Sequence, residues 1–288
     1  MRKNYGIPYK GSKNKIAEDI IDFLPSGNTL VDLFGGGGAI TDCASKSCKW
    51  EKIIYNEIDK LPHDCFIKAL KGEFDNEERW ISKEDFLKLK DTDCYAACCF
   101  SFGNDFKTYM YSKEIEPLKK KCHEAIMSNP EYIKARKEMK FGDMVKTRTP
   151  IQKELIGVRG KGVHPDCVEG MSNVENLERI QSLKTDYIDN IHFYNEDYRN
   201  IQIPDNSIIY CDIPYRNTNN YKKSIAFNYE TFYQWCVDMS NKGYEVFISE
   251  YNIPDDRFEE VWCKEKRSAF NDKKSLKTIE KIYTVKKK

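Results

Sequence analysis

The chain has 288 residues and a net charge of +1, with 40% hydrophobic and 13% aromatic residues. This length and composition predict one large domain, or one domain with a substantial insertion, and a sizeable core. No run of about 18 apolar residues occurs, and the opening MRKNYGIPYKGSK lacks the apolar block of a signal peptide. We therefore exclude membrane-spanning and secreted classes and expect a soluble, cytoplasmic protein.

The first 72 residues alternate between strand-like and helix-like segments. Apolar spacing predicts an amphipathic helix over 13–24, which Pro25 ends. Apolar runs at 29–34 and 52–57 predict buried strands, and helices are expected over 39–46 and 60–71. This βαβ alternation is typical of a parallel sheet with helices on its faces.

From residue 73 to residue 189 the pattern becomes mostly helical. Ser82 and Asp85 have the spacing of a capping box, and further helices are expected over 114–127, 130–139 and 175–183. The alternation then returns, with strands expected at 191–197, 207–211, 244–249 and 281–285 and a helix at 229–241. We therefore predict an α/β domain built from residues 1–72 and 190–288, with a helical subdomain inserted at 73–189.

The eleven cysteines predict thiols rather than disulfides. Their number is odd and no export signal precedes them. The closest cluster, Cys94, Cys98 and Cys99, lacks the paired spacing and the further ligands that a zinc site needs. We expect buried structural cysteines and no metal ion.

Basic residues are concentrated within the helical region. Between Lys113 and Lys161 there are thirteen Lys and Arg residues against seven Asp and Glu residues. A solvated helical surface gives such a pattern, and so does a surface that binds nucleic acid. If DNA is the partner, these side chains are candidates for phosphate contacts. The candidates are Lys119, Lys120, Lys121, Arg136, Lys137, Arg148 and Arg159.

The segment DLFGGGGAI, residues 32–40, joins a predicted strand to a predicted helix. Glycines at such a turn allow a ligand to approach the backbone closely. Glu57 ends the next strand, 19 residues after Gly38, where an acid can bind ribose hydroxyls. Thr41 and Ile40 occupy the positions at which either register of the dinucleotide fingerprint needs a small residue. The turn therefore favours S-adenosylmethionine over NAD, and a plain glycine-rich turn is the remaining alternative.

The segment CDIPY, residues 211–215, ends another predicted strand. Ligands of open α/β sheets bind at the carboxyl ends of strands. Pro214 favours an extended Ile213, so that the Ile213 carbonyl and the Asp212 carboxylate can converge on one exocyclic amino group. Tyr215 offers a ring that can stack on a base. The alternative is a helix-capping Asp followed by a structural Pro-Tyr pair.

The D-x-P-Y tetrad, the D-L-F-x-G-x-G turn and their order resemble the Dam-type (D12 class) DNA adenine-N6 methyltransferases. The segments SFGN and YMYSKEIE in the middle region look like those of phage-borne relatives. The resemblance implies a Rossmann-like, S-adenosylmethionine-dependent fold with an inserted helical target-recognition subdomain. It also implies double-stranded DNA as partner, S-adenosylhomocysteine as product, and residence in a bacterial or phage-infected cell. We expect a monomer that needs no metal.

The same resemblance assigns roles residue by residue. The cofactor positions are Tyr9, Lys13, Asp32, Phe34, Gly36, Gly38, the ribose-binding Glu57 and the adenine-binding Asp197. The catalytic positions are Asp212, Ile213, Pro214 and Tyr215. Ile213 departs from the usual Pro, but the resemblance implies that this position acts through its backbone carbonyl, which Ile retains.

The expected activity is methyl transfer to N6 of an adenine flipped out of duplex DNA. A catalytically silent DNA-binding module with the same fold is one alternative. Methylation of cytosine N4 or of RNA is another, although Asp212 favours adenine because the cytosine-N4 group usually begins its tetrad with Ser. A NAD oxidoreductase would need the missing fingerprint and a hydride-transfer site.

Overall fold

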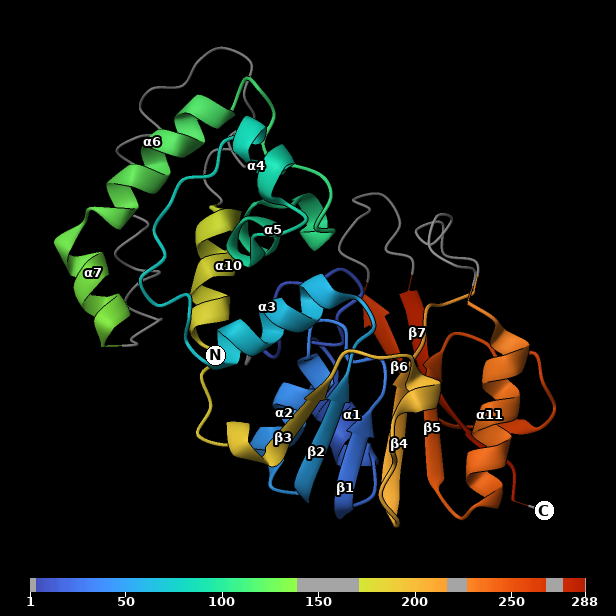
Figure 1. Ribbon diagram of the computed structural model, residues 1–288. Coiled ribbons are helices and arrows are strands. Elements are labelled where there is room, and N and C mark those ends of the chain that lie inside the picture. Colours follow the sequence, from blue (N-terminus) through green and yellow to red (C-terminus); the bar gives the residue numbers. More distant parts are fainter. Residues whose placement is uncertain (1–3, 139–170, 217–226, 268–276, 288) are drawn as a thin grey trace. The chain divides into compact units, whose positions relative to one another are not determined.

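The computed structural model describes residues 4–138, 171–216, 227–267 and 277–287 (Figure 1). The chain forms two compact units. The helical unit comprises residues 1–12 and 61–186, and the sheet unit comprises residues 13–60 and 187–288. The N-terminal segment and most of the helix at 60–70 therefore group with the helical region. The proposed role of residues 73–189 in target recognition stays a prediction.

One seven-stranded sheet organises the sheet unit, in the order β3-β2-β1-β4-β5-β7-β6. The first five strands in this order are parallel, and β7 pairs antiparallel with both β5 and β6. The predicted Rossmann-like α/β class is thereby confirmed. The strands are β1 (Gly27–Asp32), β2 (Trp50–Asn56), β3 (Ile191–Tyr194), β4 (Ser207–Asp212), β5 (Glu245–Glu250), β6 (Phe258–Arg267) and β7 (Lys277–Val285).

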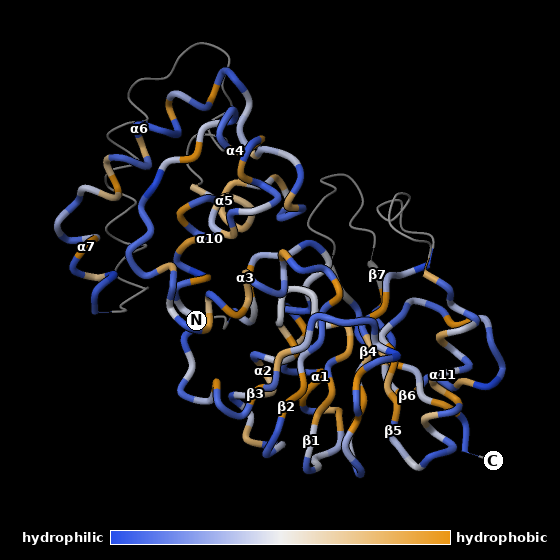
Figure 2. Tube along the Cα trace, viewed as in Figure 1, coloured by the Kyte–Doolittle hydropathy of each residue, from blue (hydrophilic) through white to orange (hydrophobic). Residues whose placement is uncertain are grey.

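Helices cover both faces of the sheet, so the central strands are continuous apolar runs. The helices of the sheet unit are α1 (Ala17–Phe23), α2 (Ala39–Ser47) and α11 (Tyr229–Asn241). Short 3-10 turns lie at Ile188–Asn190 and Tyr198–Asn200. Figure 2 shows hydrophobic residues concentrated along β1 and β4. Asn228 begins α11 because its side chain accepts a hydrogen bond from the Thr231 amide.

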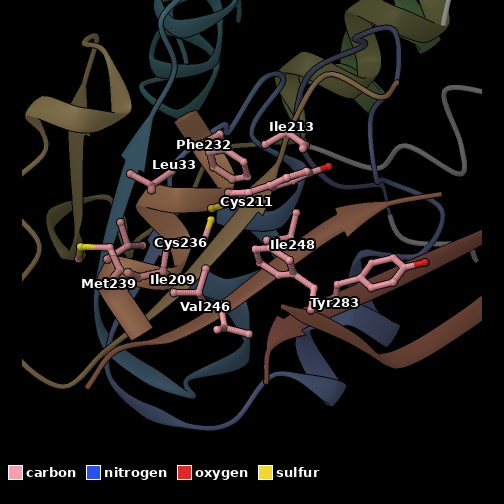
Figure 3. Close-up of a cluster of buried hydrophobic side chains, with 14 of the residues drawn as sticks. Leu33, Ile209, Cys211, Ile213, Phe232, Cys236, Met239, Val246, Ile248 and Tyr283 are labelled. Atoms are coloured by element: carbon pink, nitrogen blue, oxygen red, sulfur yellow. The ribbon is translucent and has the colours of Figure 1, made fainter. Parts of the chain in front are cut away.

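Alternation along the strands decides which side chains meet α11. Ile209, Cys211 and Ile213 of the β4 segment join Phe232 and Cys236 of α11 in one buried cluster (Figure 3). Successive residues of a strand point to opposite faces. Asp212 therefore projects from the other face of the sheet, which α1 covers: Phe23 of α1 packs edge-on against Phe247 of β5.

Six α-helices form the described part of the helical unit. α5 packs against α10, and a buried hydrogen-bond network joins the aromatic and polar side chains around them. In that network Tyr111 donates to Asn173, and the Asn173 amide lies 2.8 Å from Nδ1 of His123. The helices are α3 (Lys60–Leu70), α4 (Lys83–Leu89), α5 (Cys94–Phe100), α6 (Glu116–Met127), α7 (Pro130–Lys137) and α10 (Ser172–Gln181).

The elements follow the sequence-based prediction closely. The Ser82 side chain accepts from the Asp85 amide at the start of α4, as the capping spacing predicts. The cysteines of α5 are buried free thiols, which confirms that prediction. Strand β6 was not predicted, because its exposed charged residues, such as Glu259 and Glu265, hide the apolar pattern of an edge strand.

The segment 101–111, SFGNDFKTYMY, does not continue α5 as an α-helix. Instead α5 ends at Phe100, a 3-10 turn spans Phe102–Asn104, and Ser101 forms an antiparallel bridge with Tyr109. The helix fails here because Gly103, Asn104 and Phe106 all adopt positive φ.

Candidate active site

The Gly-rich turn between β1 and α2 has a backbone that demands glycine. Gly36 and Gly38 have φ of 49° and 73°. Gly35 has no room for a side chain, because an added Cβ would collide with the ring of Tyr55. The Tyr55 hydroxyl donates to the Gly36 carbonyl at 2.7 Å. Tyr55, a side chain of β2, therefore fixes the conformation of the turn.

Asp32 ends β1 in a buried and incompletely satisfied position. Its side chain is 1% exposed, and Oδ2 accepts a hydrogen bond from the Thr41 hydroxyl at 2.8 Å. Within the described part of the chain, Oδ1 has no hydrogen-bond partner. Burial raises the pKa of Asp32 to about 7, and the charges of Asp212 and Glu57 act in the same direction.

Glu57 follows β2 and reaches back to the turn. Its Oε2 accepts from the Gly36 amide at 2.8 Å, and its Oε1 accepts from the Asp59 amide at 2.8 Å. Burial raises the pKa of Glu57 to about 7. The carboxylate thus ties the end of β2 to the Gly-rich turn, at the position from which ribose binding is predicted.

Strand pairing brings the turn and the CDIPY segment together. β1 and β4 are neighbours, Asp32 is aligned with Tyr210, and the Leu33 amide donates to the Tyr210 carbonyl at 3.1 Å. Both motifs leave the sheet at the carboxyl ends of adjacent parallel strands. The strand order reverses between β1 and β4, and this is where open α/β sheets bind their ligands.

Lys13 joins the CDIPY segment directly. Its ammonium donates to Asp212 Oδ1 and to the Tyr215 hydroxyl oxygen, each at 2.6 Å. The Lys13 side chain is 4% exposed and that of Asp212 is 21% exposed. Burial alone would lower the pKa of Lys13, but the carboxylates of Asp212 and Glu280 outweigh it, so the pKa is raised and Lys13 is a cation.

The rest of the tetrad is held by neighbouring elements. The Ile213 side chain is 1% exposed and lies beside Phe232 of α11 (Figure 3). The Pro214 carbonyl accepts from the Tyr229 hydroxyl at 2.7 Å. The Tyr215 ring meets the Tyr251 ring edge-on, with centroids 4.5 Å apart. Ile213 therefore anchors the segment through its side chain, which explains how a residue other than Pro fits here.

Two further carboxylates at this edge of the sheet were missed by the sequence analysis. Glu250 ends β5, and its carboxylate accepts from the amides of Arg216 and Tyr251 at 3.0 and 2.8 Å. Glu280 of β7 accepts from Ser249 at 3.2 Å and from the Tyr215 hydroxyl. Glu250 could have been found as an acid at a strand end, whereas the strand containing Glu280 was predicted to begin only at residue 281.

The predicted cofactor residues Phe34 and Asp197 also belong to the sheet unit. The Phe34 ring packs against Tyr198 and Phe232, with centroids 5.4 and 5.6 Å away. Asp197 caps the short 3-10 turn that begins at Tyr198, and a hydrogen-bonded ion pair with Arg199 lowers its pKa. Phe34 and Asp197 are thus linked through Tyr198.

Tyr9 belongs to the helical unit, whereas the other predicted cofactor residues belong to the sheet unit. Its ring packs edge-on against Phe106, with centroids 5.4 Å apart. The next residue, Lys10, donates its amide to the Asn104 carbonyl at 2.9 Å. The N-terminal segment therefore supports the turn at 102–106, and a cofactor contact by Tyr9 stays a prediction.

Two of the predicted phosphate-binding residues are buried instead. Lys119 is 1% exposed, and its ammonium lies 5.9 Å from the centroid of the Tyr111 ring. Arg136 is 8% exposed and donates to the carbonyls of Asp75 and Glu77. Both lie on the inner faces of their helices, so they support the fold rather than a phosphate. Lys120, Lys121 and Lys137 are exposed, and Arg148 and Arg159 lie outside the described residues.

Residues 9–138 match the family model of the D12 class N6 adenine-specific DNA methyltransferases. Over these residues, the chain is similar to that family. The match confirms the predicted resemblance and associates the chain with DNA adenine methylation in general. It covers the Gly-rich turn, Glu57 and the helical region through α7, and it ends before the tetrad. A search among curated proteins finds no match.

Two general properties complete the description. No helix in the part of the chain that the structure describes is long and apolar enough to cross a membrane. Among the same residues, no group of three or more His, Cys, Asp or Glu side chains could hold a metal ion.

Proposed function

We propose that the protein transfers a methyl group from S-adenosylmethionine to N6 of an adenine that is flipped out of double-stranded DNA. The observation that carries the proposal is the position of Asp212. It lies at the carboxyl end of β4, next to the Gly-rich turn that follows β1, and it is held by the buried Lys13. Its carboxylate is still partly exposed.

The residues around the turn fit S-adenosylmethionine. The positive-φ glycines, Gly36 and Gly38, leave the backbone open to close approach. The buried Oδ1 of Asp32 is an unsatisfied acceptor among the described residues, which suits a positively charged ligand. Phe34, Glu57 and Asp197 would hold the adenosine part. When bound, the cofactor supplies an electrophilic methyl group and leaves as S-adenosylhomocysteine.

The tetrad would prepare the target nitrogen. The Asp212 carboxylate and the Ile213 carbonyl accept hydrogen bonds from the N6 amino group, which draws the nitrogen toward sp³ geometry and frees its lone pair. Positive charge develops on N6 as the new N–C bond forms, and the Asp212 carboxylate stabilises it. No covalent link between protein and DNA is needed, since the remaining contribution is proximity and orientation.

The target atom is inaccessible inside the base stack, so the adenine must leave the duplex. Extrusion costs a few kcal/mol, and stacking on an aromatic ring returns about 1–3 kcal/mol. Tyr215 is the ring at this position, and its edge-on contact with Tyr251 fixes its plane. Lys120, Lys121 and Lys137 are exposed and suited to phosphate contacts that position the duplex.

The direct test incubates the purified protein with isotopically labelled S-adenosylmethionine and mixed-sequence duplex DNA, followed by mass spectrometry of the nucleosides. We expect labelled N6-methyladenine, and we expect Asp212→Asn to lower the rate by at least about a hundredfold. Asn keeps the shape of Asp212 but not its charge. Asp238→Asn on the exposed face of α11 is the matched control and should leave the rate unchanged.

The outcomes separate the alternatives. Labelled N4-methylcytosine, or label that appears only when RNA replaces the DNA in the same assay, would replace adenine in DNA as the target. Binding of DNA without any label, together with no calorimetric signal for S-adenosylmethionine, would favour a silent DNA-binding module. Full activity of Asp212→Asn would refute the role of the tetrad.

A further inference from the structure

Glu280 lies on the same face of the sheet as Asp212, although β7 is antiparallel to the strands that carry the predicted motifs. Asp212 is aligned with Ser249 of β5, and Ser249 is aligned with Ile282 of β7. Glu280 is two residues from Ile282, so its side chain points to the same face. It is 1% exposed. Strand pairing thus places a buried acid beside the tetrad.

Glu280 contacts Lys13, which holds Asp212, and Tyr215 of the CDIPY segment. Its Oε1 accepts from the Tyr215 hydroxyl and from Ser249, and it lies 3.5 Å from the Lys13 ammonium. Lys13 is closer to Asp212, at 2.6 Å. Lys13 therefore lies between two carboxylates, of which one is partly exposed to a substrate and the other is buried in the sheet.

We propose that Glu280 is a positioning residue for methyl transfer, which acts through Lys13 and Tyr215 to keep the charge of Asp212 available to the target amino group. The inference rests on the proposed function. Lys13 orients Asp212 but also neutralises it. Glu280 also pairs with the Lys13 ammonium, so the two carboxylates and the ammonium together carry one net negative charge. Without Glu280, the Lys13–Asp212 pair would be neutral just where positive charge develops on N6.

The low exposure of Lys13 and Glu280 strengthens the argument. Interactions between charges that water does not separate are several times stronger than those at a surface. A residue that only filled space here would not need to be an acid, because burying a carboxylate is unfavourable unless it is paired. Glu280 is paired with Lys13, which contacts Asp212, and with Tyr215, whose hydroxyl Lys13 also contacts.

The test compares Glu280→Gln, Lys13→Met and the double variant with the wild-type protein, at saturating S-adenosylmethionine and DNA. Gln still accepts from the Tyr215 hydroxyl but carries no charge. We expect Glu280→Gln to lower kcat by about tenfold or more. Fluorescence of 2-aminopurine at the target base should stay as in the wild type, because Tyr215 keeps its acceptor. Glu259→Gln on the exposed side of β6 is the matched control, with kcat within about twofold of wild type.

The double variant separates a charge effect through Lys13 from a merely structural effect. With Lys13 removed, adding Glu280→Gln should change kcat by less than about threefold. This comparison also remains decisive if Glu280→Gln alone fails to fold, since the double variant removes both charges together. A tenfold further loss, or a wild-type kcat for Glu280→Gln, would overturn the inference while the proposed function stands. Absence of adenine methylation by the wild-type protein would overturn both.

Discussion

Buried charges occur in both units, and their surroundings differ. In the sheet unit, Asp32 is buried with one oxygen that has no partner among the described residues. In the helical unit, Arg136 is buried with its guanidinium bonded to two backbone carbonyls and to Glu78. An incompletely satisfied charge costs stability and is typical of a functional site, whereas a satisfied one supports the fold. The two buried charges should therefore respond in opposite ways to substitution.

The largest expected effect is on the pH dependence of stability at Asp32. Its folded pKa of about 7 lies above the unfolded value near 4. The protonated group therefore contributes stability below about pH 4, and this contribution is lost as the pH rises through about 7. Relative to wild type, Asp32→Asn should gain about 2–4 kcal/mol of unfolding free energy between pH 4 and pH 8.

Urea unfolding across this pH range measures the effect. Thr41 can still donate to the Asn side-chain oxygen, so the comparison isolates the carboxylate. Asp238→Asn on the exposed face of α11 controls for the loss of one negative charge elsewhere. A constant difference between Asp32→Asn and wild type over this range would mean that Asp32 is not buried as an acid, and the contrast between the units would fail.

The opposite response is expected in the helical unit. Arg136→Met leaves the carbonyls of Asp75 and Glu77 without this donor, so the free energy of unfolding should fall by about 2–3 kcal/mol. The adjacent Lys137 is exposed, and Lys137→Met should change stability by less than about 0.5 kcal/mol. Urea denaturation of the two variants tests this directly, and equal losses would contradict the assignment of Arg136 to the fold.

Some residues of the candidate site could be placed from the sequence, and others could not. Asp32 and Asp212 could be placed together because each ends an apolar run, and the carboxyl ends of parallel strands share one edge. Glu280 could not be placed at this site from the sequence. Its contact with Lys13 depends on an antiparallel pairing between β5 and β7 that no local pattern predicts. Lys13 was assigned to the cofactor, and its pairing with Asp212 emerges only from the fold.

The charged run at 119–121 shows where a usable signal was overlooked. Lys119, Cys122, His123 and Ile126 are spaced at three, four and seven residues, which defines one face of a helix. All four are buried. Helical periodicity could therefore have separated Lys119 from Lys120 and Lys121, whereas a count of charges treats them alike.

A smaller effect is expected from glycines of the sheet unit. Gly35→Ala forces a Cβ against the Tyr55 ring and should lower stability by about 1–3 kcal/mol. In Gly27→Ala the nearest atom, Cγ1 of Ile208, would be 3.4 Å from the new Cβ, so the cost should stay below about 1 kcal/mol. Thermal unfolding compares the stability of the two variants. If Gly35→Ala were as stable as wild type, Tyr55 would not fix the turn.

The smallest effect concerns the exposed lysines of α6. If Lys120 and Lys121 contact phosphates, replacing both by Gln should reduce the slope of log Kobs against log salt by about 1–2, with modest loss of affinity. Lys242, exposed just before β5 begins and hence at the amino-terminal edge of the sheet, is the matched control. Lys242→Gln should leave the slope unchanged. Fluorescence anisotropy with duplex DNA over a salt series measures all three proteins. An unchanged slope for the α6 variant would show that its exposed charges, unlike the buried ones, only solvate the surface.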